Sequence, residues 1–327
     1  MPFAMYRGRD ARGTAKLAAA CCAFGRLVCG KMHTMTRRFA LGAVLVCSLL
    51  TACGRGRRTI VVGSKNFTEQ VILGELLAQR LERSTGLRVE RRFFLAGTYI
   101  CQQALLEGRI DTYVEYTGTA LTAVLKMPVD RDPKRVFEEV KHEYASRFGI
   151  VVLDPLGFDN TFAIVIRGDT ARRLKLHTIS AAARYSSKWR AGFGYEFMER
   201  PDGFHGLVQT YHLTFAEPPR IMDLGLLYRS LLEKQVDLVA GNSTDGLIAA
   251  RDLTILEDDK HYFPPYQAVP LVRSETLKRH PEVRQALEQL AGKISEEEMR
   301  RMNYAVDGEH RDPADVVREF LHDKHLN

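Results

Sequence analysis

The main part of the sequence is poor in cysteine. Of the six cysteines, four lie upstream of Cys53, and Cys101 is the only one that follows it. If Cys53 is the lipid-bearing first residue of the mature chain, as its surroundings suggest below, Cys101 is the only free thiol and no internal disulfide is expected. Cys101 lies in a helical pattern at residues 99–106, where a buried, unreactive side chain is expected rather than a nucleophile.

The common catalytic motifs are also missing. The chain has no G-x-S-x-G, no H-E-x-x-H and no Walker loop, and Gly192-Phe-Gly194 lacks the third glycine of a dinucleotide fingerprint. The histidines are scattered along the chain. These absences argue against an extracytoplasmic enzyme, and we expect neither a cofactor nor a metal site.

The excess of positive charge is confined to the start of the chain. The formal net charge is +7, but residues 1–52 hold eight Lys and Arg residues against a single acid, Asp10. From Cys53 onward the chain has 39 basic and 39 acidic residues. This neutral main part gives no support for binding to nucleic acid or to an anionic membrane surface.

No apolar run is long enough for a membrane span, which needs about 20 apolar residues. The run at residues 39–50 has twelve; it follows Arg37 and Arg38 and precedes Thr51-Ala-Cys53, which is signal-peptide architecture. Leu50-Thr-Ala-Cys53 resembles the lipobox of bacterial lipoproteins, in which cleavage precedes the cysteine and the cysteine carries lipid. An ordinary secretory signal is the alternative. Because a complete signal begins at Met35, we interpret residues 1–34 as the result of a start codon assigned too far upstream.

The stretch Asp111-Thr-Tyr-Val-Glu-Tyr-Thr-Gly-Thr119 combines two tyrosines, acidic residues and a turn. Alternating apolar and polar residues at 110–114 predict a strand, and Thr119 is a suitable cap for a following helix. Ligands in open α/β sheets lie beyond the carboxyl ends of strands. Tyr116 and Thr119 are therefore expected at the mouth of a cleft, with packing of the tyrosines at the sheet edge as the alternative.

Strand and helix patterns alternate through the rest of the chain. The predicted strands are residues 59–65, 87–95, 110–114, 150–153, 160–166, 191–194, 236–240, 253–256 and 268–272. The first helix is expected to begin at an N-cap, Thr68, and to stop at Gly86. The other predicted helices are residues 98–107, 136–148, 179–185, 203–212, 225–234, 281–291, 295–303 and 313–322, the last two capped by Ser295 and Asp312.

This alternation predicts an α/β fold with two lobes, each a mostly parallel sheet flanked by helices. The C-terminal helices have no strand partner except the first lobe, so the second lobe is interpreted as an insertion and the chain crosses twice between the lobes. We expect a leader at 1–52, a tether at 53–58, a first lobe at 59–158 and 254–327, and a second lobe at 159–253. Hinges are expected near residues 158–161 and 241–253.

Five motifs occur in order: Gly63-Ser-Lys-Asn-Phe-Thr-Glu-Gln70, Tyr116-Thr-Gly-Thr119, Asp159-Asn-Thr-Phe162, Ser243-Thr-Asp-Gly246 and Phe263-Pro-Pro-Tyr266. Together they resemble the substrate-binding proteins of osmoprotectant ABC transporters, which bind glycine betaine, carnitine and choline. The resemblance covers nearly everything from Thr59 onward. It implies a type II periplasmic-binding-protein fold whose two lobes close over a ligand, and delivery of that ligand to a membrane permease.

In that family an aromatic cage holds the quaternary ammonium group. Carried over by motif, the cage positions are Tyr116, Phe162, Asn242 and Tyr266. Phe162 and Asn242 stand where relatives often have tyrosine, so one wall lacks its ring and the cargo could differ. Residues suited to hydrogen-bond the other end of the ligand are Ser64, Asn66, Thr119, Asn160 and Thr244. Each of these could instead serve as a cap or turn residue.

Together with the lipobox-like segment that ends at Cys53, the resemblance predicts a lipid-anchored, extracytoplasmic monomer whose partners are a small quaternary amine and an ABC permease. A binder of another solute, such as an amino acid, would need an arginine for the carboxylate and an acid for the ammonium. Arg200 could face the cleft in that role, although bracing its own loop is the better expectation. The effector domain of a transcription regulator is a further alternative, but a signal occupies the place where its DNA-binding helices would lie.

Overall fold

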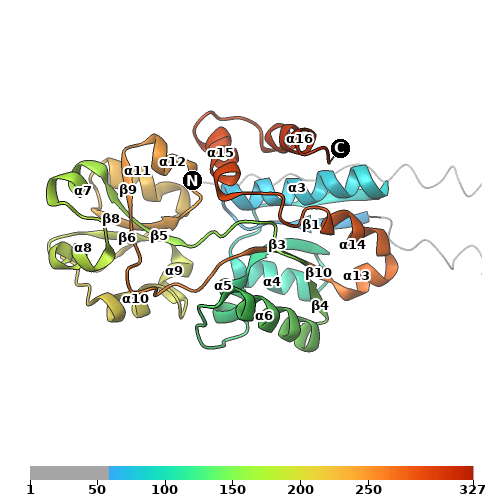
Figure 1. Cartoon of the computed structure of the whole chain (residues 1–327), viewed down its shortest axis with the longest axis horizontal. Coiled ribbons are helices and arrows are strands. Elements are labelled where there is room, and N and C mark those ends of the chain that lie inside the picture. Colours follow the sequence, from blue (N-terminus) through green and yellow to red (C-terminus); the bar gives the residue numbers. More distant parts are fainter. Residues whose placement is uncertain (1–58, 327) are drawn as a thin grey trace, which may run out of the picture. The chain divides into compact units, whose positions relative to one another are not determined.

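The computed structural model describes residues 59–326, so the expected leader, the tether and Cys53 lie outside the described residues. Residues 59–326 contain two five-stranded sheets. We call the first sheet with its helices the first half, and the second sheet with its helices the second half. In Figure 1 the first half lies at the right, coloured from blue to green with its C-terminal part in orange-red, and the second half lies at the left, coloured from yellow-green to orange. Within residues 59–326, no helix combines the length and the hydropathy needed to cross a membrane.

The first sheet has the strand order β2-β1-β3-β10-β4. Its strands are β1 (Thr59–Gly63), β2 (Arg88–Arg92), β3 (Thr112–Tyr116), β4 (Ile150–Val152) and β10 (Ala268–Arg273). β1 runs parallel to β2 and β3, whereas β10 runs antiparallel to both β3 and β4. The sheet is therefore mixed, and a strand from late in the chain lies between two early ones.

Helices cover both faces of the first sheet (Figure 1). They are α3 (Thr68–Thr85), α4 (Thr98–Leu106), α5 (Thr117–Thr119), the π-helix η1 (Ala120–Val124), α6 (Pro133–Phe148), α13 (Ser274–Arg279), α14 (Pro281–Glu288), α15 (Glu296–Asp307) and α16 (Pro313–Asp323). In β1, Ile60 and Val62 pack into the core that includes α3, and Val61 packs into the core that includes α4 and α6. A strand covered on both faces reads as a continuous apolar run, which is the pattern at Thr59–Gly63.

The second sheet has the strand order β7-β6-β8-β5-β9. Its strands are β5 (Phe162–Arg167), β6 (Ala191–Phe193), β7 (Arg220–Ile221), β8 (Leu238–Asn242) and β9 (Leu253–Leu256). β6 is parallel to β7 and β8, whereas β5 is antiparallel to β8 and β9. The helical segments of this half are α7 (Gly168–Leu174), α8 (Ile179–Ser186), α9 (Tyr195–Glu199), α10 (Phe204–Tyr211), η2 (Leu224–Leu226), α11 (Leu227–Leu232) and α12 (Gly246–Ala250).

The chain crosses between the halves after β4 and again after β9. The two crossing segments run side by side in Figure 1, and Asp159 and Gln267 form an antiparallel bridge between them.

The expected second hinge at 241–253 is wrong. These residues include the end of β8 and α12, which belong to the second half, and the chain crosses back only after β9. The boundary expected at 253/254 is also wrong, because β9 pairs with β5 and so belongs to the second sheet. An edge strand joins a sheet by pairing with strands that are distant in the sequence. The residue pattern of a short strand gives no information about that pairing.

Two expected helix caps also differ from the structure. Thr68 is the first residue of α3 rather than its cap, and its hydroxyl donates to Asp307 at 2.5 Å. Thr119 lies inside a helical segment that begins at Thr117, directly after β3. The expected caps Ser295 and Asp312 are confirmed, and Gly86 ends α3 with φ 65°.

Candidate ligand-binding site

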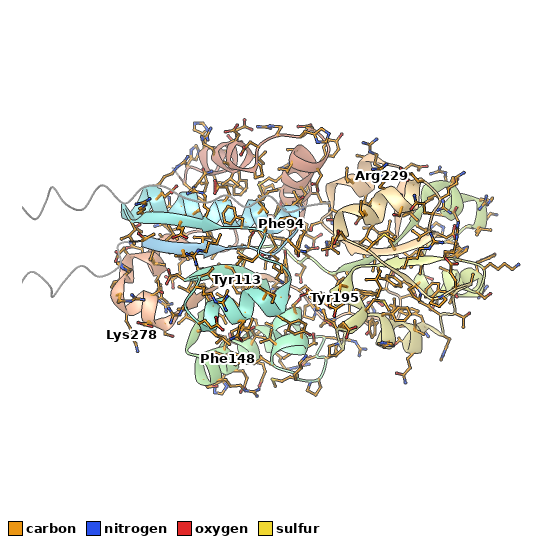
Figure 2. All side chains as sticks on the ribbon, turned by 180° about the vertical axis from the view of Figure 1, so that it is seen from behind. Phe94, Tyr113, Phe148, Tyr195, Arg229 and Lys278 are labelled. Atoms are coloured by element: carbon orange, nitrogen blue, oxygen red, sulfur yellow. The ribbon has the colours of Figure 1, made fainter. Side chains whose placement is uncertain are left out.

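A cavity of about 430 Å³ is lined by residues of both halves and of the crossing segments. This volume falls in the range of small-molecule sites, about 300–1,000 Å³. The first half contributes Lys65, Asn66, Phe67, Ala96, Gly97, Tyr99, Ile100, Tyr116 and Thr119; the crossings and the start of β5 contribute Asn160, Phe162 and Tyr266; the rest of the second half contributes Tyr195, Glu196, Phe197, Arg200, Met222, Asp223, Leu224, Ala240 and Asn242. Figure 2 shows Tyr195 where the two halves meet.

The structure brings together seven of the nine residues expected at the site. Tyr116, Phe162, Tyr266, Asn242, Thr119, Asn160 and Asn66 all line the cavity. Ser64 and Thr244 are fully buried and do not line it. The Ser64 hydroxyl accepts a hydrogen bond from the backbone N–H of Phe94 at 3.0 Å, and the Thr244 hydroxyl donates to Glu69. These two side chains stabilise neighbouring loops rather than facing the cavity.

Strand register explains how Phe162 and Asn242 come to face the same space. The two residues are direct partners across the antiparallel pair β5 and β8. Side chains of opposite residues in such a pair stand on the same face of the sheet. Asn242 therefore leaves open the space beside the Phe162 ring that a larger side chain would fill.

The aromatic side chains of the cavity pack mainly edge to face. The Phe162 ring lies 5.8 Å from the Tyr266 ring with an interplanar angle of 78°, and 4.8 Å from the Phe197 ring at 72°. Gly118 allows the turn after β3 to approach this cluster, because a Cβ there would lie 2.8 Å from the Tyr266 ring and 2.6 Å from the carbonyl oxygen of Pro265. The glycine of Tyr116-Thr-Gly-Thr119 is thus required by close packing.

Arg200 is a buried cation at this ring cluster. Its guanidinium donates to both carboxylate oxygens of Asp202, at 2.9 and 2.5 Å, and to the Thr119 hydroxyl at 3.0 Å. It also lies over the Phe162 and Tyr266 rings, 4.9 and 5.8 Å from their centroids. Burial lowers the pKa of Arg200, but the Asp202 charge outweighs burial and the net shift is upward. Arg200 therefore stays charged, and it both braces its loop and faces the cavity.

A second buried ion pair lies next to Tyr116. The Lys65 ammonium contacts the Glu115 carboxylate and lies 5.0 Å from the centroid of the Tyr116 ring. Both partners of the pair are almost completely buried. The chain thus already places one of its own cations against a cavity ring, with a carboxylate to balance the charge.

The hydroxyl of Tyr116 points to a buried carboxylate, Glu69, in α3. Glu69 accepts hydrogen bonds from the Tyr116 hydroxyl at 2.6 Å, the Asn160 amide at 2.7 Å and the Asn303 amide at 3.0 Å, as well as from Thr244. Burial raises the pKa of the Glu69 carboxyl, and the four donated hydrogen bonds oppose that effect. Tyr266 is arranged similarly, since its hydroxyl donates to Asp202 at 2.6 Å.

Several residues that line the cavity were not predicted from the sequence, chiefly Lys65, Tyr195 and Glu196. Tyr195 follows β6 by two residues, as Asn66 follows β1 and Tyr116 ends β3. The rule that ligands lie beyond the carboxyl ends of strands, which located Tyr116, would therefore also have found Tyr195. The cavity contains more rings than the four cage positions suggested, because Phe67, Tyr99, Tyr195 and Phe197 line it as well.

Two α/β halves joined by two crossing segments, with a cavity between them, define a solute-binding protein of the type II periplasmic class. The chain belongs to the family described as the substrate-binding domain of ABC-type glycine betaine transport systems, whose model matches residues 58–323. It is therefore a transport substrate-binding protein and not an enzyme.

Similar proteins include the carnitine transport binding protein OpuCC of Listeria monocytogenes, 38% identical over 279 residues that cover 84% of this chain and 90% of that protein. The ergothioneine transport permease/ergothioneine binding protein EgtU of Helicobacter pylori (strain G27) is 36% identical over 265 residues, covering 81% of this chain and 47% of that protein. A solved glycine betaine/carnitine/choline ABC transporter structure has a TM-score of 0.69 at 35% identity and covers 82% of this chain and 99% of that chain.

Proposed function

We propose that this protein is an extracytoplasmic lipoprotein that captures a quaternary ammonium osmoprotectant, of the glycine betaine, choline or carnitine type, and delivers it to an ABC permease. The observation that carries the proposal is that the rings of Tyr116, Phe162 and Tyr266 line one cavity between the two halves. A trimethylammonium group has no N–H donor, so a carboxylate attracts it only diffusely. Ring faces match both its positive charge and its methyl surface.

Arg200 supports a ligand that also carries a carboxylate. The guanidinium has five N–H donors in a planar fork, and three of its hydrogen bonds go to Asp202 and Thr119. In this proposal its remaining N–H groups meet a ligand carboxylate at the cavity wall. This favours a zwitterion such as glycine betaine or carnitine over choline, because choline has no carboxylate.

Lipid anchoring rests on Leu50-Thr-Ala-Cys53, which lies outside the described residues. In the proposed arrangement the lipid on Cys53 holds the binding halves at the membrane through a tether that ends at β1. In this proposal the two halves act as lobes that close about the crossing segments when ligand binds.

An amino acid is the second candidate ligand, and one observation favours it. Arg200 and Glu196 line the same cavity. An arginine for a carboxylate and an acid for an ammonium group are the two charges that an amino acid zwitterion requires.

Isothermal titration of the purified full-length chain separates these candidates. The ligands are glycine betaine, carnitine, choline, proline betaine, ergothioneine and a set of common amino acids. We expect saturable binding of at least one trimethylammonium compound at micromolar concentration, which corresponds to about 8 kcal/mol. Binding of amino acids with no response to any quaternary amine at millimolar concentration would transfer the assignment to the second candidate.

A further inference from the structure

Glu69 differs in one respect from Asp202 and Glu115, two other buried carboxylates beside the cavity tyrosines. Asp202 is paired with Arg200 and Glu115 is paired with Lys65, so each has a cationic partner. Within residues 59–326, Glu69 forms no ion pair, and its four partners are neutral hydroxyl and amide groups. The residue is 2% exposed. A buried carboxylate is thus left without a cationic partner in the part of the chain that the structure describes.

The hydrogen bonds to Glu69 fit an ionised carboxylate. Two of the donors are amide NH₂ groups, which can only donate, and they reach different oxygen atoms of Glu69. An ionised carboxylate accepts about four hydrogen bonds in total, whereas a protonated carboxyl has a donor to place as well. Burying an ion without an opposite charge is costly, and hydrogen bonds from neutral groups compensate only in part. The Lys65 ammonium lies 5.0 Å from the centroid of the Tyr116 ring but is paired with Glu115, so a ligand cation would complete the compensation.

Tyr116 links Glu69 to the cavity. The phenol hydroxyl donates to Oε1 of Glu69 at 2.6 Å, and the same residue lines the cavity. A phenol that donates to a carboxylate gains electron density, because the O–H bond is polarised toward the acceptor and the oxygen passes charge into the ring. The negative face of the ring is the part that attracts a cation. The carboxylate therefore both fixes the ring and makes its face more negative.

We propose that Glu69 acts through Tyr116 as the counter-charge of the bound quaternary ammonium group and so determines the preference of the site for cations over neutral groups of the same shape. This role rests on the proposed function. Glu69 does not touch the ligand in this arrangement; it is a positioning and polarising residue. The Tyr266 hydroxyl donates to Asp202 in the same way, but Arg200 already neutralises that carboxylate.

The test compares each quaternary amine with its tert-butyl isostere, in which carbon replaces the nitrogen and the charge is lost. The measured quantity is the charge preference, the ratio of the Kd of the isostere to the Kd of the amine, for whichever amine binds the wild type best. Titrations use the full-length wild type, Glu69→Gln, Tyr116→Phe and the double variant. Tyr211→Phe is the matched control, because the Tyr211 hydroxyl also donates to a carboxylate, Asp258, but the residue does not line the cavity.

We expect Glu69→Gln to lower the charge preference about threefold to tenfold. The loss is only part of the free energy of one cation–ring contact, because the Tyr116 ring remains. The affinity for the isostere should stay within about twofold, because the ring remains in place. Tyr116→Phe should lower the charge preference in the same direction. The double variant should lose no more than Glu69→Gln alone, because the two groups act as one unit. Tyr211→Phe should leave the ratio unchanged.

A merely structural role predicts a different result. In that case Glu69→Gln weakens the amine and the isostere equally, the ratio stays constant, and the proposal is overturned. Since glutamine places an N–H donor where an oxygen accepted bonds, thermal unfolding is measured for every variant. Tyr116→Phe decides the question if Glu69→Gln does not fold, because it keeps Glu69 and its other three hydrogen bonds; an unchanged ratio then overturns the proposal. A wild type that binds neither amine nor isostere overturns both the proposed function and this role for Glu69.

Discussion

Replacing Phe162 separates aromatic recognition of a cation from simple apolar burial. The Phe162 ring lies at the centre of the cluster, 4.8 Å from Phe197, 5.7 Å from Phe263 and 5.8 Å from Tyr266. Phe162→Leu keeps most of the apolar surface but removes the ring quadrupole. Phe162→Tyr keeps the ring and adds a hydroxyl. The two variants therefore differ chiefly in the property that a quaternary ammonium group recognises.

The expected loss for Phe162→Leu is the worth of one cation–ring contact, about 0.5–2 kcal/mol. At 1.4 kcal/mol for each factor of ten, this is roughly a 2- to 30-fold increase in Kd. Phe162→Tyr should stay within about threefold of the wild type, since the ring is retained. Isothermal titration with the best quaternary amine measures both. The Arg200 guanidinium also lies over this ring, so a separate loss of stability should appear in thermal unfolding of Phe162→Leu.

Phe148→Leu provides the matched control. Phe148 is also half-buried and packs edge to face on Tyr144, with centroids 5.3 Å apart, and it does not line the cavity. Figure 2 shows it in the first half, away from Tyr195. This variant should lower the unfolding temperature and leave the affinity unchanged. If Phe162→Leu binds the amine as tightly as the wild type does, the ring of Phe162 plays no part in cation recognition.

Three further outcomes are expected. Asn242→Tyr should tighten binding of a compact trimethylammonium ligand by filling the space beside Phe162, whereas a weaker titration signal would mean that a bulkier natural ligand occupies that space. Cys53→Ser should release the protein from the membrane fraction or stall its processing, and a normally processed, membrane-bound variant would refute lipidation at Cys53. Burial raises the pKa of Asp245 to about 6. As the pH falls through this value, the folded wild type takes up a proton before the unfolded chain does, so its unfolding temperature should rise relative to that of Asp245→Asn; a difference that is constant with pH would contradict the shift.

Local patterns in the sequence predicted the elements that local chemistry determines. β9 has the expected bounds, Gly86 ends α3 in the left-handed conformation, and Ser295 is the expected cap, which in the structure forms a capping box with Glu298. Each of these depends on a few adjacent residues. The sheet that β9 joins was predicted wrongly, because strand pairing depends on residues far along the chain.

The site was predicted to the extent that it follows from strand ends and motifs. Phe162 and Asn242 face the same cavity because they are register partners, a relation that the motifs alone do not state. Thr244 and Ser64 look like ligand-binding groups in sequence, yet their hydroxyls bond to other parts of the protein. A polar side chain in a loop has the same sequence signal in both roles, and only the direction in which it points distinguishes them.

The position of β10 between β3 and β4 has a consequence for the order in which the protein folds. The strands of the second sheet all lie within residues 162–256, a continuous stretch of chain. The first sheet lacks the strand that joins β4 to β3 until residues 268–273 are available, and α15 must follow before Asn303 reaches Glu69. During synthesis or export the second half can therefore complete its sheet first. The ability to bind ligand then arises only when the C-terminal part of the chain has joined the part made earliest.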